Sequence, residues 1–597
     1  MLNDTYVYRK ANMKRYKISS FTKQMFTRQY FPALSSALVL SVADMADALV
    51  VGNRMGSVGL AAIAFAIPIF MIYNVISHSF GLGGAVVFSK KMADGHENEA
   101  TSDYKGVLVT LFVLGLLFAV IGNIFTGTFA RLLGANPSNQ ELFLATVTYL
   151  RFLFAGAPFC FFGYTVGYYM RNDDLYKEAS VAAQIGNGCD FFLNIILVLF
   201  AGLGVMGAAL STLLGLMITS ALEVYFIYGR HSHLKLFPLK ARFKDVFTSY
   251  KTGFASCISY IFTFIYIWIG NNALFRLSGE IGVAVFEVVQ SLSYMVGYIF
   301  GAISQASQPI LSAYEAECNY QESDGAQTLT RNVGIITAAV LIFIIEMFPG
   351  QICMLFGLND EASLAYGIYA LRVFALSILF AGFNLLLANI YTARDITRPA
   401  LIISTLRGFV VLIPVMLILI FFGEKAFWLT YAVTELVSFI IFCIYYRFFM
   451  KMNERLDEDM IYTRTLRGNV DDMGSVLSKV EEFLEKWEAS PKQTYYVQMA
   501  IEEVCSAIIN NGFVKMPENS GLIQLTLVTK GDKDFSMFIR DNAVIFNPFD
   551  MNKKHASEMD EGSDEDFNAL GMDVIKKKAK YFYYRRYQGF NTMVVKI

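Results

Sequence analysis

Charged residues are scarce in this chain: only 17% of its 597 residues are Asp, Glu, Lys or Arg, against about 25% in an ordinary soluble chain. The net charge is −1, so no basic surface for nucleic acid is expected. The seven cysteines are scattered without CxxC spacing, which argues against a disulfide framework. No GxxxxGK[ST] phosphate loop is present, so the motor of an ATP-driven pump is not expected.

Two further absences concern the chain's ends and loops. Residues 1–30 are polar and basic, so no cleavable signal peptide is expected. His231 and His233 have a spacing that can bind metal, but no third ligand accompanies them in a basic loop. No metal site is therefore predicted, and we interpret this loop as solvated.

Hydrophobic residues make up 55% of the chain and concentrate between positions 31 and 450. A bilayer core of about 30 Å needs about 20 apolar residues per helix. The sequence therefore predicts an α-helical polytopic membrane protein with twelve spans, followed by an α+β domain over 455–597. The predicted spans lie near 31–51, 60–88, 105–126, 143–170, 181–203, 205–228, 253–277, 283–308, 332–350, 368–393, 399–422 and 426–449.

The loops differ in their content of Lys and Arg. The arm 1–30 and the loop 230–251 are both rich in basic residues, whereas loops on the other side hold only Arg54, Arg131, Arg276 and Lys425. Because basic loops stay in the cytosol, both termini are predicted to be cytosolic, in a cell-membrane protein.

The predicted spans form two copies of one unit, 31–230 and 231–450. Three short motifs recur at a displacement of 223 positions: GSVG at Gly56 and GEIG at Gly279, LGxN at Leu133 and FGxN at Phe356, and Arg171 followed by Asn against Arg394 followed by Asp. Two six-span halves in the same orientation predict a substrate site between them. This arrangement favours a transporter, although a channel can also arise by duplication.

Asp47, Asp190 and Glu287 lie inside predicted spans. A carboxylate at the bilayer centre costs about 2.5–3.5 kcal/mol on insertion scales, so such groups face the protein interior and serve a function or a structural hydrogen bond. Asp44 is one turn from Asp47, and Asn194 is one turn from Asp190. A buried carboxyl group close to a second one can exchange protons at neutral pH, which predicts a proton- or sodium-coupled site.

Several segments resemble the multidrug and toxic compound extrusion (MATE) family. These segments are DALVVG from Asp47, GLAA from Gly59, MRND from Met170, GVMGAALST from Gly204 and QASQPI from Gln305. The resemblance covers about residues 20–450. It implies two six-helix lobes around a central cleft that opens to one side at a time, and a monomer that moves small molecules without being an enzyme.

The resemblance also implies a cation-coupling site in the first lobe. The family's motif places it at Asp47, Asp190, Asn194 and Thr212, with the span-5 Asn and Asp in exchanged positions here. Pro32 matches the family's bending proline on span 1, and a proline inside a helix permits a kink. A second-lobe site found in some relatives lacks its carboxylates in this chain. Glu287 has no family counterpart; a substrate contact, a proton carrier and a partner of Arg276 or a polar neighbour remain open. Asp44, Glu287 and Pro32 are thus candidates along the transport path.

Beyond position 455 the periodicity changes to that of a soluble domain. Helices are expected at 472–488, 493–511 and 570–580, strands at 521–530 and 534–541, and a closing hairpin with its turn at 588–589.

These segments resemble the histidine-kinase and anti-sigma-factor (GHKL) ATP-binding domain. The matching segments are AIEEV at Glu503, RDNAVIFNP at Asp541 and LGM at Gly571. The resemblance implies a role for these three residues toward ATP and Mg²⁺. However, Ala507 occupies the position of the Mg²⁺-binding Asn, and Ala543 and Ala569 replace glycines. A degenerate regulatory or docking module, with a cytosolic protein partner, and a working nucleotide site both remain open.

Three functions are compatible with this sequence. The first is a secondary antiporter that exports small amphipathic or cationic compounds in exchange for H⁺ or Na⁺. The second is a flippase for lipid-linked precursors, which would be expected to need more Lys and Arg within the spans than this chain has. The third is a membrane-tethered signalling protein that acts through its tail.

Overall fold

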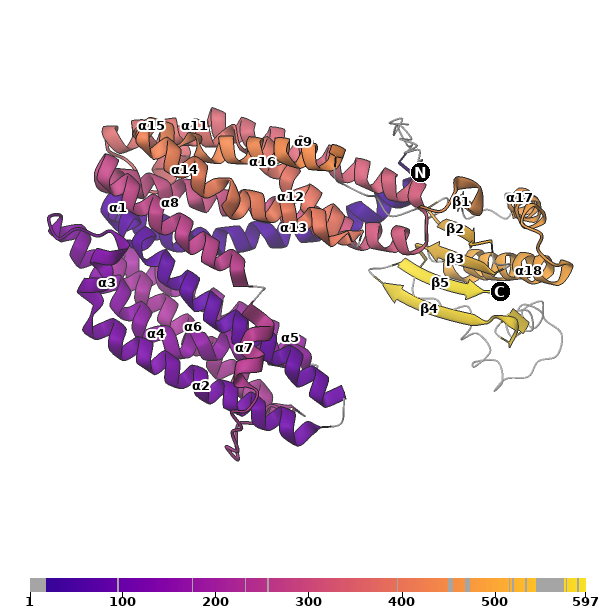
Figure 1. Ribbon diagram of the computed structural model, residues 1–597, viewed down its shortest axis with the longest axis horizontal. Helices are drawn as coiled ribbons and strands as arrows, with labels where there is room; N and C mark the ends of the chain where they lie inside the picture. The colour runs from indigo at the N-terminus through magenta and orange to yellow at the C-terminus, as the bar shows by residue number, and fades with distance from the viewer. Residues whose placement is uncertain are drawn as a thin grey trace, which may run out of the picture.

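The computed structural model describes a largely helical membrane domain with a small sheet at one end (Figure 1). The described residues are 18–93, 96–173, 175–230, 232–254, 257–394, 396–448, 455–467, 473–514, 516–517, 520–531, 534–543, 574–575, 577–587 and 590–597. Two helical lobes meet at one end and diverge toward the other, and the sheet continues from the far end of the second lobe (Figure 1). The beginning of α1 and the C-terminus both lie at this sheet.

The first lobe contains α1 to α7, and α1 is a helix of 74 residues. Its length is more than three times what a bilayer needs, and its regular backbone is interrupted at Gly56, where φ is 59° and ψ is −141°. Only glycine adopts that conformation without strain. Because these angles are not helical, they divide α1 into two segments at Gly56. The helices are α1 Ser20–Ala93, α2 Glu97–Ile124, α3 Thr126–Leu133, α4 Gln140–Asn172, α5 Tyr176–Asn194, the π-helix Ile195–Phe200, α6 Val205–Gly229 and α7 Val246–Phe254.

The second lobe contains α8 to α16, and its long first helix has the same break. In α8, which has 59 residues, the interruption falls at Gly279, where φ is 62° and ψ is −149°. The helices are α8 Ile258–Ala316, α9 Tyr320–Met347, α10 Pro349–Leu355, α11 Glu361–Ala375, α12 Ile378–Ala393, α13 Thr397–Thr405, the π-helix Leu406–Val410, α14 Leu412–Phe421, α15 Glu424–Phe427 and α16 Leu429–Phe448.

The internal repeat predicted from the sequence is confirmed in the backbone. Gly56 and Gly279 are 223 positions apart, and so are Gly134 and Gly357, which both have positive φ. The short helices α3 and α10, which precede the second pair, begin 223 positions apart as well.

Within the described residues, nine helices are long and apolar enough to cross a membrane, or ten if the bent pair α11 and α12 forms one span. Two of the nine are α1 and α8, each long enough for two crossings. The protein is therefore a multi-pass membrane protein.

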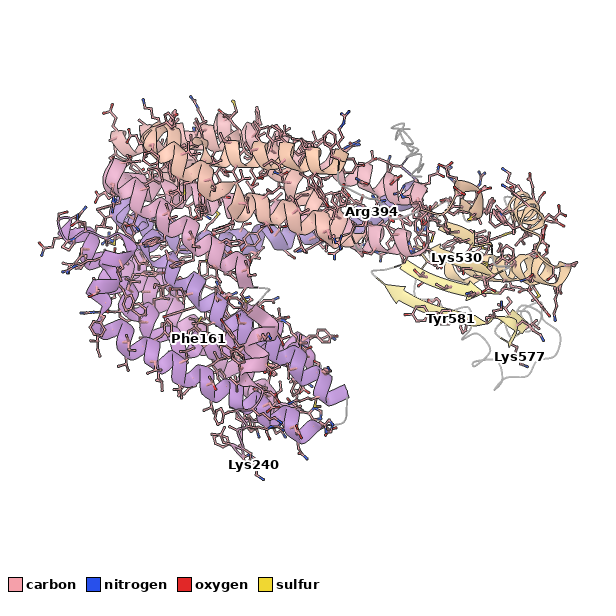
Figure 2. All side chains as sticks on the ribbon, in the orientation of Figure 1. Phe161, Lys240, Arg394, Lys530, Lys577 and Tyr581 are labelled. Atoms are coloured by element: carbon pink, nitrogen blue, oxygen red, sulfur yellow. The ribbon has the colours of Figure 1, made fainter. Side chains whose placement is uncertain are left out.

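Direct contacts join the lobes at their meeting point. The side-chain amide of Asn53 donates to the carbonyl of Leu355 at 2.6 Å, and the indole of Trp268 donates to the carbonyl of Leu132 at 2.8 Å. The backbones of Gly52 and Gly357 approach so closely that a Cβ on Gly357 would lie 1.9 Å from the Gly52 carbonyl oxygen. At the diverging ends, Figure 2 shows Lys240 at the tip of the first lobe and Arg394 at the end of the second, beside the sheet. The lobes are thus closed at one end and apart at the other.

The C-terminal region, hereafter the tail, is an α+β unit as predicted. Its sheet has five antiparallel strands in the order β1-β2-β3-β5-β4. The amphipathic helices α17 and α18 pack on it through a core that includes Val480, Val504 and Leu525. The elements are β1 Ile461–Arg467, α17 Met473–Lys486, α18 Pro491–Ala507, the π-helix Ile508–Gly512, β2 Leu522–Thr529, β3 Phe535–Asp541, β4 Tyr581–Tyr587 and β5 Phe590–Lys596.

The sequence missed β1 and found the other four strands. β1 is short and shows no clean alternation: its side chains are mostly half-buried, and only Leu466 is fully buried. Of the predicted helix 570–580, the described residues 574–575 and 577–578 are helical, whereas 579 and 580 are not. The predicted turn at 588–589 lies outside the described residues. The predicted closing hairpin is confirmed by the pairing of Tyr587 with Phe590.

Candidate functional site

Asp47 lies on the first segment of α1, nine residues before the break at Gly56, and it collects hydrogen bonds from three other helices. The amide of Asn194, on α5, donates to Oδ1. The hydroxyl of Tyr149, on α4, donates to Oδ2 at 3.2 Å. Thr212, on α6, reaches the same oxygen at 3.4 Å but also bonds to the Ala208 carbonyl at 3.1 Å. The structure therefore brings together three of the four residues predicted from the sequence.

Asp190, the fourth predicted residue, lies beside Ser211 and Thr212 and close enough to Asp47 for the two carboxylates to interact. It fits against α6 because Gly215 has no side chain: a Cβ there would lie 2.8 Å from the Cβ of Asp190. The two carboxylates thus come from different helices, and α6 holds Asp190 in position.

Two oxygens of this site are buried without a hydrogen-bond partner. They are Oδ1 of Asp190 and Oδ1 of Asn194, which lie one turn apart on α5. Buried polar atoms normally have a partner. The unpaired carboxylate oxygen of Asp190 can therefore take a proton or a small cation, and the unpaired amide oxygen of Asn194 can bind a small cation. Immediately after Asn194 the chain forms a π-helix at Ile195–Phe200, a feature frequently found at functional sites.

A small cavity adjoins the site. Its volume is about 10 Å³, and Tyr149 and Thr212 contribute the polar groups of a mainly apolar lining, which includes Phe70 and Leu216. A volume of about 10–15 Å³ holds one water molecule. The arrangement around Asp47 thus has room for a water or ion, and no room for a drug-sized molecule.

Asp44 contacts the other lobe. Although it is only three residues from Asp47, its carboxylate accepts a hydrogen bond from the hydroxyl of Tyr298 on α8. The sequence places the two aspartates one helical turn apart. In the structure, however, Asp47 bonds to the first lobe and Asp44 to the second. α1 therefore contacts both lobes at the level of Asp44 and Asp47.

Glu287 is buried in the second lobe, with 6% of its surface exposed. Among the described residues it forms no ion pair, and its neighbour Ser291 donates to Oε1 at 3.4 Å. The structure therefore does not pair Glu287 with Arg276, one of the alternatives that the sequence left open. Pro32 is exposed on α1, and the helix runs through it without an irregular φ or ψ.

Four buried or hydrogen-bonded polar residues of the membrane domain were missed by the sequence analysis. Tyr149 and Tyr298 carry no signal that separates them from the many other tyrosines of the chain. Glu223 and Glu435 had one, since both are carboxylates within predicted spans. Glu223 is buried beside Arg171, and Glu435 accepts hydrogen bonds from Arg407 and Asn384, at 2.7 Å each.

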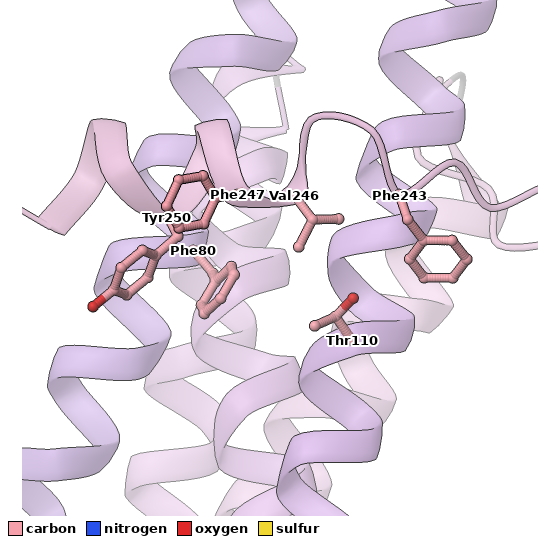
Figure 3. A pocket seen from close by; sticks show the side chains of 6 residues that line it. All are labelled: Phe80, Thr110, Phe243, Val246, Phe247 and Tyr250. Carbon is pink, nitrogen blue, oxygen red and sulfur yellow. The ribbon is translucent and has the colours of Figure 1, made fainter.

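A second hollow, far more open than the first, is formed between α7, α1 and α2 (Figure 3). Its volume is about 510 Å³ and its lining is aromatic: Phe80 and Tyr250 lie with ring centroids 5.2 Å apart, and Phe243 and Phe247 complete the wall. None of the described residues that line it is charged. The hollow therefore lacks the chemistry of an ion site.

In the tail, Asp541 is 3% exposed and is already engaged. Its Oδ1 accepts hydrogen bonds from the backbone N–H of Ala543 at 2.9 Å and from the amide of Asn591 at 2.8 Å. Glu503, on α18, has one buried oxygen without a partner, and burial followed by the charge of Glu502 raises its pKa. Ala507 is buried at the end of the same helix. Gly571 lies outside the described residues.

These groups do not fit a Mg²⁺-nucleotide. Magnesium requires near-octahedral oxygen ligands, and Ala507 has no oxygen in its side chain. The carboxylate of Asp541 faces the interior of the tail, where two protein donors already bond to it.

Comparison with known proteins identifies the membrane domain. The model of the MatE family matches residues 32–197 and 253–418, one stretch in each lobe and more than half of the chain. Probable multidrug resistance protein YoeA of Bacillus subtilis (strain 168) is 24% identical over 450 residues, which cover 71% of this chain and 93% of YoeA. Multidrug export protein MepA of Staphylococcus aureus (strain MRSA252) is 22% identical over 396 residues, covering 65% and 85%.

Solved structures show the same fold. An inward-facing multidrug resistance MATE family transporter of the MOP superfamily superimposes with a TM-score of 0.61 at 19% identity, covering 70% of this chain and 97% of that chain. An outward-facing structure gives a TM-score of 0.52 at 20% identity, covering 72% and 98%. The chain belongs to the MatE family and is a membrane transporter, not an enzyme.

Proposed function

We propose that this protein is a secondary antiporter that exports small amphipathic or cationic compounds in exchange for H⁺ or Na⁺. The observation that carries the proposal is the site around Asp47, where two carboxylates on different helices lie close together and two buried oxygens lack a donor. The relatives YoeA and MepA, a probable multidrug resistance protein and a multidrug export protein, support the class of substrate.

The coupling role follows from charge and position. Two carboxylates that are close together in a site of low dielectric repel one another unless a proton or cation is shared between them. Asp47 is bonded to α4, α5 and α6, so loss or gain of a cation changes how tightly α1 binds the first lobe. Asp44, on the same helix, bonds to Tyr298 of the second lobe. Binding of an ion is thereby connected to the relative position of the lobes.

The proposal includes a topology of twelve spans with both termini in the cytosol. α1 and α8 each cross the membrane twice, with the breaks at Gly56 and Gly279 as the turning points, and α11 with α12 forms one bent crossing. The basic loop that contains Lys240 lies at the diverging ends of the lobes (Figure 2), which supports an arrangement open to the cytosol.

Transport measurements on the variant Asp47→Asn test this function. The amide preserves shape and most hydrogen bonds but cannot cycle its charge, so we expect drug export driven by an H⁺ or Na⁺ gradient in proteoliposomes to fall to background. Glu361→Gln, which changes an exposed carboxylate at the start of α11, serves as the control and should export normally. Unchanged export by a folded Asp47→Asn variant would remove Asp47 from the mechanism.

For the tail we propose a GHKL-like domain that serves regulation and binds no Mg²⁺-nucleotide. The engaged carboxylate of Asp541 and the buried methyl group of Ala507 support this proposal. Titration calorimetry of the full-length protein with Mg·ATP should give no binding heat, and tight binding would restore the nucleotide site.

A further inference from the structure

The tail is bound to the membrane domain by one side of its sheet. Arg540, on the central strand β3, forms a buried ion pair with Glu317 in the α8–α9 turn; the two side chains are 5% and 8% exposed. Asn319, in the same turn, donates to Thr526 of β2 at 3.0 Å and to Thr463 of β1 at 3.1 Å. A buried ion pair with supporting amide bonds is the signature of a specific interface, because either charge alone would be costly to bury.

The same side of the sheet also binds the beginning of α1. Asn542 donates to the side-chain oxygen of Gln24 at 2.8 Å, and the ring of Phe590 packs edge-on against Phe21, with centroids 5.5 Å apart. Phe590 and Leu522 belong to the apolar core of the membrane domain rather than to that of the tail. The tail therefore touches α1 and the α8–α9 turn at once.

Those two partners are bonded to one another at the same place. Thr22, in the first turn of α1, shares a hydrogen bond of 2.7 Å with the hydroxyl of Tyr314 and another of 2.7 Å with Glu322. The guanidinium of Arg540 lies over the ring of Tyr314, 5.3 Å from its centroid. The sheet therefore covers the joint that fastens the start of α1 to the second lobe.

Beyond this joint, α1 has few neighbours until it reaches the coupling site. Between positions 31 and 42 only Ala37 and Ser41 are buried, and Phe31 and Val39 are 62% and 69% exposed. The helix is thus held at two places: at the tail and at Asp44 with Asp47. When the lobes rock between their two arrangements, α1 cannot keep both its contact with Tyr298 in one lobe and its contact with Asn194 in the other.

We propose that the tail is a clamp that holds the start of α1 against the second lobe, and that this clamp has to open in each transport cycle. This inference rests on the proposed transport function. β3 provides the rigidity, because it is paired on both sides, and strand alternation directs Arg540 and Asn542 to the membrane domain and Asp541 to the interior of the tail. Release of the tail frees α1 to move with the first lobe.

A reversible crosslink tests the clamp. Gln24→Cys and Asn542→Cys are combined in the full-length protein, with Cys318→Ser and Cys443→Ser to limit side reactions, and joined by a short bis-methanethiosulfonate linker. Export from proteoliposomes should be lost on crosslinking and return after reduction. The control pair, Asp459→Cys with Lys486→Cys, replaces an exposed ion pair of 3.1 Å inside the tail and should export equally in both states.

The reduced sample separates the two proposals. If the protein is not an exporter, export is absent before crosslinking and after reduction. If it is an exporter but the tail does not have to move, complete crosslinking of Gln24→Cys/Asn542→Cys leaves export unchanged, and the clamp is disproved.

A charge reversal provides a second measurement that needs no crosslink. Arg540→Glu places two carboxylates face to face, so the clamp should open and the distance between spin labels on α1 and the tail should lengthen, with faster export. Arg540→Glu with Glu317→Arg should restore both values, and Lys486→Glu, the same change in an exposed pair, should alter neither. Unchanged distance and export in the single variant would overturn the clamp.

Discussion

The two lobes share the same breaks in their backbone but differ in the side chains that fill them. Asp47 lies nine residues before the break of α1 at Gly56, and Gly270 lies nine residues before the break of α8 at Gly279. The first position carries the carboxylate of the proposed coupling site. At the second, the space of a side chain is filled by Phe286, whose ring would lie 2.9 Å from an added Cβ.

This difference shows which features of a duplicated unit resist change. The glycines with positive φ have stayed because any other residue strains the turn. Interior positions have diverged: Asp47 corresponds to Gly270, and the space beside Gly270 is filled by Phe286. The ring of Phe286 packs in turn with Tyr266 and Phe427. The duplicated backbone is common to both lobes, whereas the carboxylates of the proposed ion site belong to one lobe alone.

The strongest test of this comparison exchanges the two polar residues of α5. Asp190→Asn should lose ion-driven export, because it removes the second carboxylate. Asp190→Asn with Asn194→Asp restores one carboxylate one turn away and should regain activity, measured as drug flux in proteoliposomes. Full export by the single variant would show that the first lobe's second carboxylate plays no part.

A second test asks whether the glycine breaks of α1 and α8 contribute equally to the stability of the two lobes. Gly56→Ala and Gly279→Ala should each cost about 1–3 kcal/mol, the range for a side chain in a backbone region reserved for glycine. Neither site offers a steric clash to confuse the result, since the nearest atom to an added Cβ is 3.8 Å away at Gly56 and none lies within 4 Å at Gly279. Thermal unfolding in detergent should show similar losses; a large loss in one half alone would contradict an equal contribution.

The smallest effect is expected at Gly270, the position in the second lobe that corresponds to Asp47. Gly270→Ala pushes a methyl group against the far edge of the Phe286 ring, which can shift, so a loss of about 1 kcal/mol is expected, at the lower end for overpacking. Unlike Asp47→Asn, this variant should keep its ion-driven export per folded molecule. Loss of coupling with full stability would mean that the second lobe also takes part in ion binding.

Much of this architecture was readable from the sequence because membrane insertion imposes long apolar runs and because the repeat preserves its glycines. Asp47, Asp190, Asn194 and Thr212 were predicted together, through resemblance and through their rarity within apolar spans. Tyr149 was not predictable, since one hydroxyl among 33 tyrosines has no distinguishing pattern. The docking of Arg540 on Glu317 was equally hidden, because a contact between residues 223 positions apart in different kinds of domain leaves no periodic signal.

The close approach of Gly52 and Gly357 has a consequence for leakage. A barrier made of side chains flickers as rotamers change within picoseconds to nanoseconds, whereas collective motions of whole domains take microseconds to milliseconds. At this contact the lobes meet main chain against main chain, at a distance that excludes even a methyl group. The contact therefore has no rotamers to change. It can open only when the lobes themselves move, so fluctuations of side chains at this point do not open a path for leakage.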